Sequence, residues 1–288
     1  MMKPYFQLIR LPAGFSAVSN VLAAHLIATA GAVQAPVLLL TLLASLCLYF
    51  AGMALNDCFD LDEDRRLRAD RPLVRGQIRP VMAWRLSFAL ILAGLALSAL
   101  LGPRALLFAA LLTGLIVLYD SKRLPSALHI WVMAACRYAH WLFIFAAAGL
   151  QGAAFWLWPL PLFFYVAGLT RISEAESGVS DFSRFRNTSL GLFALAGLCL
   201  LLLSFSYGVP LTAGLSVLLW CVWLARLLRG SADLTRAEAV QGLVKQLVMG
   251  VIVMDACVLG IAGFIPAACV VLLLLLPGRY VGRWISVS

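Results

Sequence analysis

Residues 36–56, PVLLLTLLASLCLYFAGMALN, decide the fold class because they form a long apolar stretch without a single charged side chain. About 20 predominantly apolar residues suffice to cross the hydrocarbon core of a bilayer as a helix. The sequence contains ten such candidate segments: 11–31, 36–56, 80–101, 104–119, 127–150, 155–173, 188–207, 210–228, 239–261 and 264–277. The last segment is short and ends at Pro277-Gly278, so the sequence predicts nine to ten membrane helices.

The composition of the whole chain supports this interpretation. Of its 288 residues, 63% are hydrophobic and only 12% are charged, whereas a soluble domain is roughly 45–50% apolar and roughly 25% charged. A water-soluble core cannot bury that excess, which excludes a soluble enzyme, a disordered protein and a secreted disulfide scaffold. We therefore expect an all-α, polytopic transmembrane bundle that forms one integral-membrane domain over residues 1–288.

The charged residues collect in four polar connections between the apolar segments. These connections are 57–79, 120–126, 174–187 and 229–238. They hold most of the lysines and arginines, whereas Arg104 is the only cation on the opposite side, so the positive-inside rule places them and the amino terminus in the cytoplasm. Twelve of the thirteen acidic residues lie there too, and Asp255 is the exception. We expect a polar cytoplasmic cap on a protein of a bacterial inner membrane, with the bilayer and not nucleic acid as partner.

Three aspartates follow the second apolar segment at a spacing that suits a shared ligand. On a continuing helix Asp57, Asp60 and Asp64 fall within an arc of about 60°. Carboxylates that converge in this way repel one another, and a divalent cation relieves the repulsion. Oxygen ligands without His or Cys suit Mg²⁺, which proteins usually share with substrate phosphates. The alternative is a solvated loop whose acids pair with the neighbouring arginines.

The same residues carry a resemblance to a known family. Asn56-Asp57-x-x-Asp60-x-x-x-Asp64, followed by R-P-x-x-x-G-x-I at 71–78, resembles the first aspartate-rich motif of the UbiA superfamily of intramembrane prenyltransferases. The resemblance implies that the three aspartates are catalytic metal ligands for Mg²⁺ and that Asn56 helps to bind the diphosphate. The implied reaction transfers an isoprenyl group from a prenyl diphosphate to an aromatic or other lipophilic acceptor.

Basic residues near the predicted cap extend the resemblance. Tyr119, Lys122 and Arg123 are similar to the family's Tyr…Lys-Arg element, whose basic pair contacts the diphosphate. Lys122 supplies a point charge and Arg123 a planar fork for phosphate oxygens; the alternative for this pair is a purely topological role. Arg137 lies inside segment 127–150, where a charge is expensive. We expect it to contact the diphosphate or to join a network with an acid.

The second acidic motif of the family, usually D-x-x-x-D, is altered in this chain. Its place is taken by Glu174, Glu176 and Asp181, of which Glu174 is our candidate metal ligand. Glu174 and Glu176 diverge by about 200° on a helix, so they meet one ion only if the chain leaves the helix. Residues 165–178, with this altered loop, look like the EboC-type UbiA-like branch.

Two further functional classes stay open at this point. The first is a non-catalytic UbiA-like protein that binds or transports an isoprenoid-like metabolite; a loop 174–181 that turns away from the first aspartates favours it. The second is a proton-coupled carrier that uses Asp255, which requires a water-filled path to that residue. The acceptor, the prenyl chain length and the oligomeric state are not encoded in any motif that we find.

Overall fold

The computed structural model describes residues 2–121, 123–174, 182–230 and 237–285, and the regular structure in these ranges is entirely helical. Ten helical stretches in this part of the chain are long and apolar enough to cross a membrane. The predicted all-α, polytopic bundle is therefore confirmed. Of the predicted nine to ten membrane helices, the described ranges contain ten.

Most helix boundaries lie within a few residues of the predicted ones. The first half of the chain forms α1 (Lys3–Leu8), η1 (Leu11–Ala13), α2 (Gly14–Ala28), α3 (Ala35–Phe59), α4 (Leu61–Leu67), α5 (Pro80–Leu100), α6 (Pro103–Asp120) and α7 (Ser126–Ala147). The second half forms α8 (Ala153–Leu157), α9 (Leu160–Ser173), α10 (Phe182–Tyr207), α11 (Pro210–Gly230), α12 (Ala237–Ile261), α13 (Ile265–Leu273) and α14 (Leu275–Trp284). Helices α5, α6 and α11 begin at proline, whose missing N–H is not needed at the first helical position.

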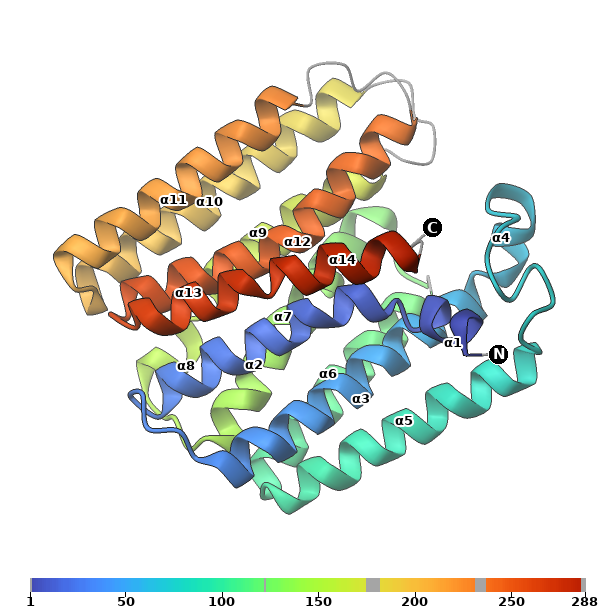
Figure 1. Cartoon of the computed structure of the whole chain (residues 1–288), viewed down its shortest axis with the longest axis horizontal. Helices are drawn as coiled ribbons and strands as arrows, with labels where there is room; N and C mark the ends of the chain where they lie inside the picture. The colour runs from blue at the N-terminus through green and yellow to red at the C-terminus, as the bar shows by residue number, and fades with distance from the viewer. Residues whose placement is uncertain (1, 122, 175–181, 231–236, 286–288) are drawn as a thin grey trace.

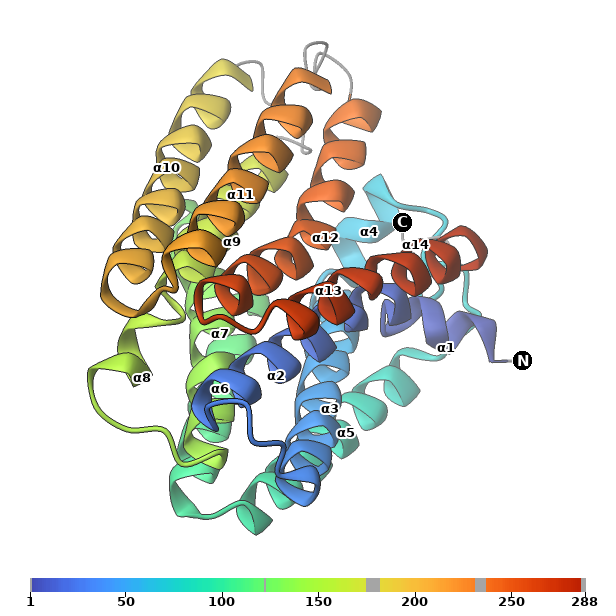
Figure 2. The ribbon, with the colours of Figure 1, turned by 60° about the vertical axis from the view of Figure 1, so that its left-hand side comes forward.

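Helix α12 lies in the centre of the bundle and is the most buried of the described spans. It packs against α2, α9, α11 and α13, whereas α3 packs on α5 and α6 packs on α7 (Figure 1). In Figures 1 and 2 the amino terminus, α1, α4 and the carboxy-terminal end of α14 lie at the same end of the molecule. Segments that are far apart in the sequence therefore meet at one end of the bundle.

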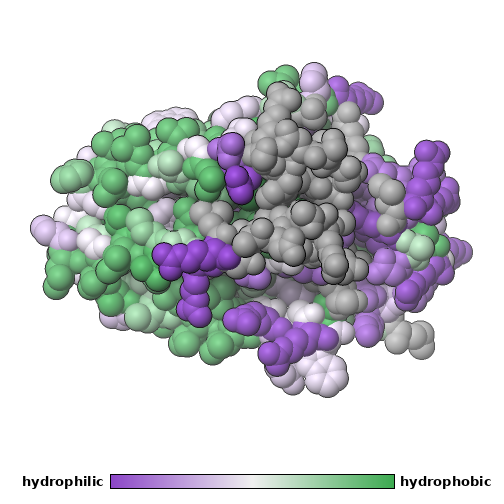
Figure 3. Space-filling view, turned by 90° about the horizontal axis from the view of Figure 1, so that it is seen from above, coloured by the Kyte–Doolittle hydropathy of each residue, from purple (hydrophilic) through white to green (hydrophobic). Residues whose placement is uncertain are grey.

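The outer surface of the bundle is apolar along the long helices. Large hydrophobic side chains such as Leu100, Leu107, Phe205 and Leu211 are exposed, and an outward apolar face of this kind is suited to lipid. Figure 3 shows hydrophobic side chains over much of one face, with hydrophilic ones gathered mainly toward the end that carries α1 and α4. The chain is an integral membrane protein with one strongly polar end.

The carboxy-terminal span differs from its predicted form. The sequence predicts that the last helix ends at Pro277-Gly278, but α14 starts directly after α13 and continues to Trp284. Pro277 lies in the first turn of α14, where a missing backbone N–H costs no intrahelical hydrogen bond. Together α13 and α14 make a stretch of 20 residues, which is long enough to be the tenth span.

Candidate functional site

The three predicted aspartates lie where α3 passes into α4. Asp57 is in the last turn of α3, Asp60 separates the two helices and Asp64 belongs to α4. The expected single helix is thus interrupted at Asp60, yet the backbone N–H of Asp64 still donates to the carbonyl oxygen of Asp60 at 2.8 Å. Because the interruption is so short, the three side chains stay on the buried side. The exposed fraction of the residue surface is 4% for Asp57, 8% for Asp60 and 3% for Asp64.

Arg71 neutralises two of these aspartates from the loop that follows α4. Its Nη1 donates to Asp57 Oδ1 at 2.9 Å and to Asp64 Oδ2 at 2.6 Å. Leu73 and Ile78, on the same segment, are buried in a small apolar cluster, and this packing brings the arginine back to α3. The pairing with arginines proposed as an alternative therefore occurs, but in a buried site and not in a solvated loop.

Burial and charge oppose each other in this ion pair. Burial raises the pKa of Asp64 above its usual range, and the charge of Arg71 counteracts part of that rise. Burial likewise lowers the pKa of Arg71, against the attraction of Asp57. Removing either partner would leave the other charge in a poorly solvated place.

The surface acid of the same segment behaves differently. Asp62 has a side chain that is 88% exposed and accepts a hydrogen bond from Arg65 Nη1 at 2.7 Å. Its carboxylate points away from the buried three, as the helical spacing predicts. An exposed pair of this kind contributes little to stability, and it provides a matched control for the buried aspartates.

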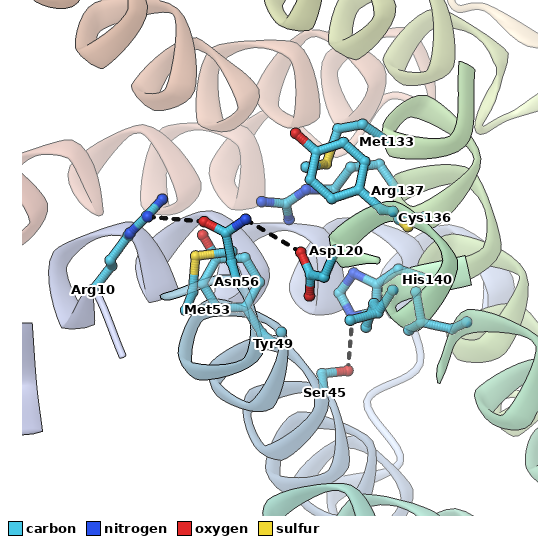
Figure 4. Close-up of a pocket in the computed structure, with 14 residues that line it drawn as sticks. Arg10, Ser45, Tyr49, Met53, Asn56, Asp120, Met133, Cys136, Arg137 and His140 are labelled. Atoms are coloured by element: carbon cyan, nitrogen blue, oxygen red, sulfur yellow. Dashed lines mark hydrogen bonds between the residues drawn. The ribbon is translucent and has the colours of Figure 1, made fainter. Parts of the chain in front are cut away.

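Two residues outside the predicted set, Arg10 and Asp120, complete the polar site. Arg10, in a left-handed conformation (φ 48°) between α1 and η1, donates through Nη2 to Asn56 Oδ1 and Asp57 Oδ1, at 3.1 Å each. Asn56 Nδ2 donates in turn to Asp120 Oδ1 at 3.3 Å (Figure 4). Asp120 is 3% exposed, and its Oδ2 is a buried atom without a hydrogen-bond partner among the described residues.

Signals for these two residues were present in the sequence but had another explanation. Asp120 directly follows Tyr119 in the basic element. Arg10 precedes the first span, where a cation is explained by its role in setting the orientation of the helix in the membrane. Their hydrogen bonds join positions 46 and 64 residues apart. Only the packing of α2, α3 and α6 could bring them to one place.

A cavity of about 140 Å³ adjoins this polar cluster between α3, α6 and α7. Apolar side chains, among them Met53, Ile116 and Met133, make up most of its wall. Arg10, Asn56 and Asp120 form a polar part of the wall, while Arg137 and His140 enter from α7 (Figure 4). The arrangement places charged groups beside a mostly apolar space.

The remaining predicted diphosphate contacts divide into three groups. Tyr119 lines the cavity and stacks on His129, with ring centroids 4.0 Å apart. Arg137 also lines the cavity, and its guanidinium donates a hydrogen bond to Asn20 of α2. Arg123 is exposed beyond the end of α6, and Lys122 lies outside the described residues.

Glu174 is the described member of the second acidic motif. It follows the last residue of α9 and forms an ion pair with Arg171 of the same helix, whose guanidinium lies over the Phe185 ring. Glu176 and Asp181 lie outside the described residues. In the part of the chain that the structure describes, no three His, Cys, Asp or Glu side chains are grouped closely enough to hold a metal ion.

Comparison with known proteins identifies relatives of this chain. The chain is 32% identical over 124 residues to digeranylgeranylglyceryl phosphate synthase of Sulfurisphaera tokodaii, an overlap of 43% of this chain and 44% of that protein. The chain thus spans less than half the length of the curated relatives that it matches.

Solved structures match over nearly the whole length. The apo UbiA homologue of Aeropyrum pernix K1 has a TM-score of 0.65 at 20% identity, covering 94% of this chain and 98% of that chain. A UbiA homologue of Archaeoglobus fulgidus has a TM-score of 0.65 at 16% identity, covering 93% and 99%. The latter was also solved with dimethylallyl diphosphate and Mg²⁺, with a TM-score of 0.51 and coverage of 93% and 98%.

The sequence model of the UbiA prenyltransferase family matches residues 17–246, which include the aspartate motif, the Tyr119 element and seven complete spans. Since this match covers most of the chain and the ten-helix fold agrees with it, the chain belongs to the UbiA prenyltransferase family.

Proposed function

We propose that the chain is a membrane prenyltransferase that moves an isoprenyl group from a prenyl diphosphate to an aromatic or other lipophilic acceptor, with the help of Mg²⁺. The observation that carries this proposal is the junction of buried carboxylates, Arg10 and Asn56 with a mostly apolar cavity. A polar end suits a diphosphate and an apolar space suits a hydrocarbon. The Archaeoglobus fulgidus relative, which binds dimethylallyl diphosphate and Mg²⁺, lends support.

The donor atoms of the site fit Mg²⁺. Asp57, Asp60 and Asp64 offer oxygen ligands only, and Asp120 adds the buried Oδ2 atom that has no hydrogen-bond partner among the described residues. Magnesium prefers such hard oxygen ligands and shares them with phosphate oxygens. These four residues would hold the ion, which supplies positive charge for the departing diphosphate.

Arg71 competes for the same carboxylate oxygens. Its Nη1 already contacts Asp57 and Asp64, so a metal ion and this arginine are alternative neutralising charges. Among the described residues no compact metal-ligand group is formed, so Mg²⁺ binding would require Arg71 to give up its contacts with Asp57 and Asp64. Glu174, with Glu176 and Asp181, stays our prediction for the second acidic motif.

The protein's own contribution to the reaction is electrostatic. The allylic C–O bond breaks with its electron pair on the diphosphate, and an electron-rich atom of the acceptor then bonds to the allylic carbon. The acceptor finally gives up a proton to the released diphosphate or to solvent. Arg10 and Arg137 line the cavity and offer fixed positive charge to the departing anion. Lys122 and Arg123 are the further proposed contacts. The apolar wall around Met53 and Ile116 keeps water from the carbocation.

We place the active face in the cytoplasm. The charge bias of loops 57–79, 120–126, 174–187 and 229–238 supports this orientation, and the polar end of the bundle holds the first of them (Figure 1). The bacterial inner membrane is our prediction from the sequence, whereas the relatives described above are archaeal.

Equilibrium binding of radiolabelled geranyl diphosphate to the purified protein in detergent tests the assignment. We expect binding that needs Mg²⁺ and that is lost in the Asp57→Asn and Asp60→Asn variants. The exposed Asp62→Asn variant is the matched control and should bind as the wild type does, because its carboxylate faces solvent. Wild-type binding by both buried variants would show that the metal assignment is wrong.

Release of inorganic diphosphate separates the two functional classes. A prenyltransferase supplied with membrane lipid extract and geranyl diphosphate should release diphosphate, and the labelled prenyl group should appear in a new lipid. A protein that binds the substrate with Mg²⁺ but releases no diphosphate with any extract would instead fit the alternative, a non-catalytic carrier or binder of isoprenoid-like metabolites.

A further inference from the structure

A buried carboxylate outside the aspartate motif lies in the middle of the bundle. Asp255, on the central helix α12, is completely buried. Ser19 Oγ donates to its Oδ2 at 2.5 Å, and Asn20 Nδ2 donates to both of its oxygens, at 2.8 and 2.7 Å. A charged group at this depth is expensive in a membrane and usually marks a functional partner. Among the described residues, both of its hydrogen-bond donors come from a single helix, α2.

Asn20 connects this carboxylate to the cavity. With its Nδ2 turned toward Asp255, its Oδ1 faces the other way and accepts a hydrogen bond from Arg137 Nη1 at 3.1 Å. An amide can turn over by exchanging its oxygen and nitrogen, and the carboxylate forbids that exchange because it accepts but cannot donate. Asp255 therefore decides which atom of Asn20 meets Arg137.

A second contact fixes the same guanidinium. Ser16 Oγ donates to the carbonyl oxygen of Ala13 at 2.7 Å, which leaves its lone pairs for Arg137 Nη2 at 3.0 Å. The Arg137 guanidinium also lies 5.0 Å from the centre of the Tyr49 ring. Residues of α2 and α3 thus hold it in the wall of the cavity that Asp120 also lines (Figure 4).

We propose that Asp255 is a positioning residue, which acts through Asn20 to hold the Arg137 guanidinium in the cavity wall, where it receives the oxyanion of a prenyl diphosphate. This inference rests on the proposed function. The buried carboxylate balances the half-buried arginine, and the oriented amide keeps its N–H groups away from the guanidinium. Without the negative charge the amide can turn over, and its N–H groups then repel Arg137.

The Asp255→Asn variant removes the charge and keeps the size. We expect its dissociation constant for geranyl diphosphate, measured with Mg²⁺, to rise about tenfold or more, as for the weakening of one charge-assisted contact. The exchange variant, Asn20→Asp with Asp255→Asn, puts the carboxylate on α2 next to Arg137 and the amide on α12. It retains the negative charge and reverses the amide–carboxylate hydrogen bond, which is now donated from α12, while the carboxylate on α2 can still accept from Arg137, so we expect it to restore the affinity to within about threefold of the wild type.

A matched control reports on general damage to the bundle. Ser87 is buried on α5 and donates only within its own helix, to the carbonyl oxygen of Ala83 at 2.9 Å. Its replacement, Ser87→Ala, should leave the dissociation constant unchanged. Thermal unfolding in detergent is followed for every variant, so that stability and affinity are compared separately.

Two results would overturn the inference. One is an Asp255→Asn variant that folds and binds geranyl diphosphate as the wild type does. The other is an exchange variant that recovers the thermal stability but not the affinity, which would make the network purely structural. Should Asp255→Asn alone not fold, the exchange variant decides between the same two readings. A wild-type protein that does not bind geranyl diphosphate would instead refute the proposed function, before any variant is compared.

Discussion

Single side chains set the electrostatic balance of the site. Arg71 lies between Asp57 and Asp64 with 2% of its surface exposed. Buried pairs of this kind contribute little net stability when intact, but removal of one partner leaves an uncompensated charge. The response of the site to a cation therefore depends on this arginine.

Replacement of Arg71 by alanine should make the fold depend on a divalent cation. Without Mg²⁺ we expect a loss of about 3–5 kcal/mol, typical for breaking a buried ion pair. Millimolar Mg²⁺ should recover much of it, because the ion can neutralise the freed carboxylates. Thermal unfolding in detergent with and without Mg²⁺ measures both effects. An equal response of the wild type and the Arg71→Ala variant to Mg²⁺ would count against a shared set of oxygens.

The Asp120→Asn variant tests the other buried carboxylate. Asn at this position can still accept the hydrogen bond from Asn56, but it replaces the carboxyl group at the cavity wall with a neutral amide, which cannot ionise on metal binding. We expect the Mg²⁺ concentration needed for half-maximal binding of geranyl diphosphate to rise about tenfold or more, because one charged ligand is lost. Thermal stability should fall little. An unchanged Mg²⁺ titration would remove Asp120 from the ligand set.

At the scale of helices and turns, the sequence predicts the membrane spans from their apolar runs. It does not predict a single-residue interruption of a helix or a contact between distant segments. Apolar runs predict the spans, and glycine or proline marks most of their ends. Nothing in the sequence marks the interruption at Asp60, where neither glycine nor proline occurs. The position of Arg71 depends on Leu73 and Ile78 packing near Leu8, a contact between distant segments that no local pattern encodes.

The turn between α5 and α6 gives a test at this scale. Gly102 has a φ of 109° with no heavy atom within 4 Å of an added Cβ, so the cost of Gly102→Ala is conformational only. We expect a loss of about 1–2 kcal/mol. Gly114, inside α6, has the same open surroundings but ordinary helical geometry. Gly114→Ala should be neutral or stabilising, and equal unfolding temperatures for the two variants would contradict the assigned backbone.

For the whole molecule, the distribution of polar and apolar surface predicts an orientation. Arg75 is exposed in the polar loop after α4, and Ala32 is exposed in the turn between α2 and α3. One position precedes the span α3 and the other follows α3 and α4, so the two positions belong to opposite faces of the membrane.

Cysteine labelling in a cysteine-free background checks this orientation. A membrane-impermeant maleimide should label the Ala32→Cys variant in intact cells, and the Arg75→Cys variant only after the membrane is permeabilised, because the arginine-rich loop is retained inside. The reverse pattern would invert the topology and place the proposed active face outside.

The order of the site residues along the chain bears on how the protein is made. Arg10, Asp57 and Arg71 all precede α5, so the buried aspartate has its cationic partners once two spans have left the ribosome. Asp120 and Arg137 arrive with later helices. A nascent chain that is still being inserted therefore already carries Asp57 together with both of its arginine partners, before the helices that bring Asp120 and Arg137 are added.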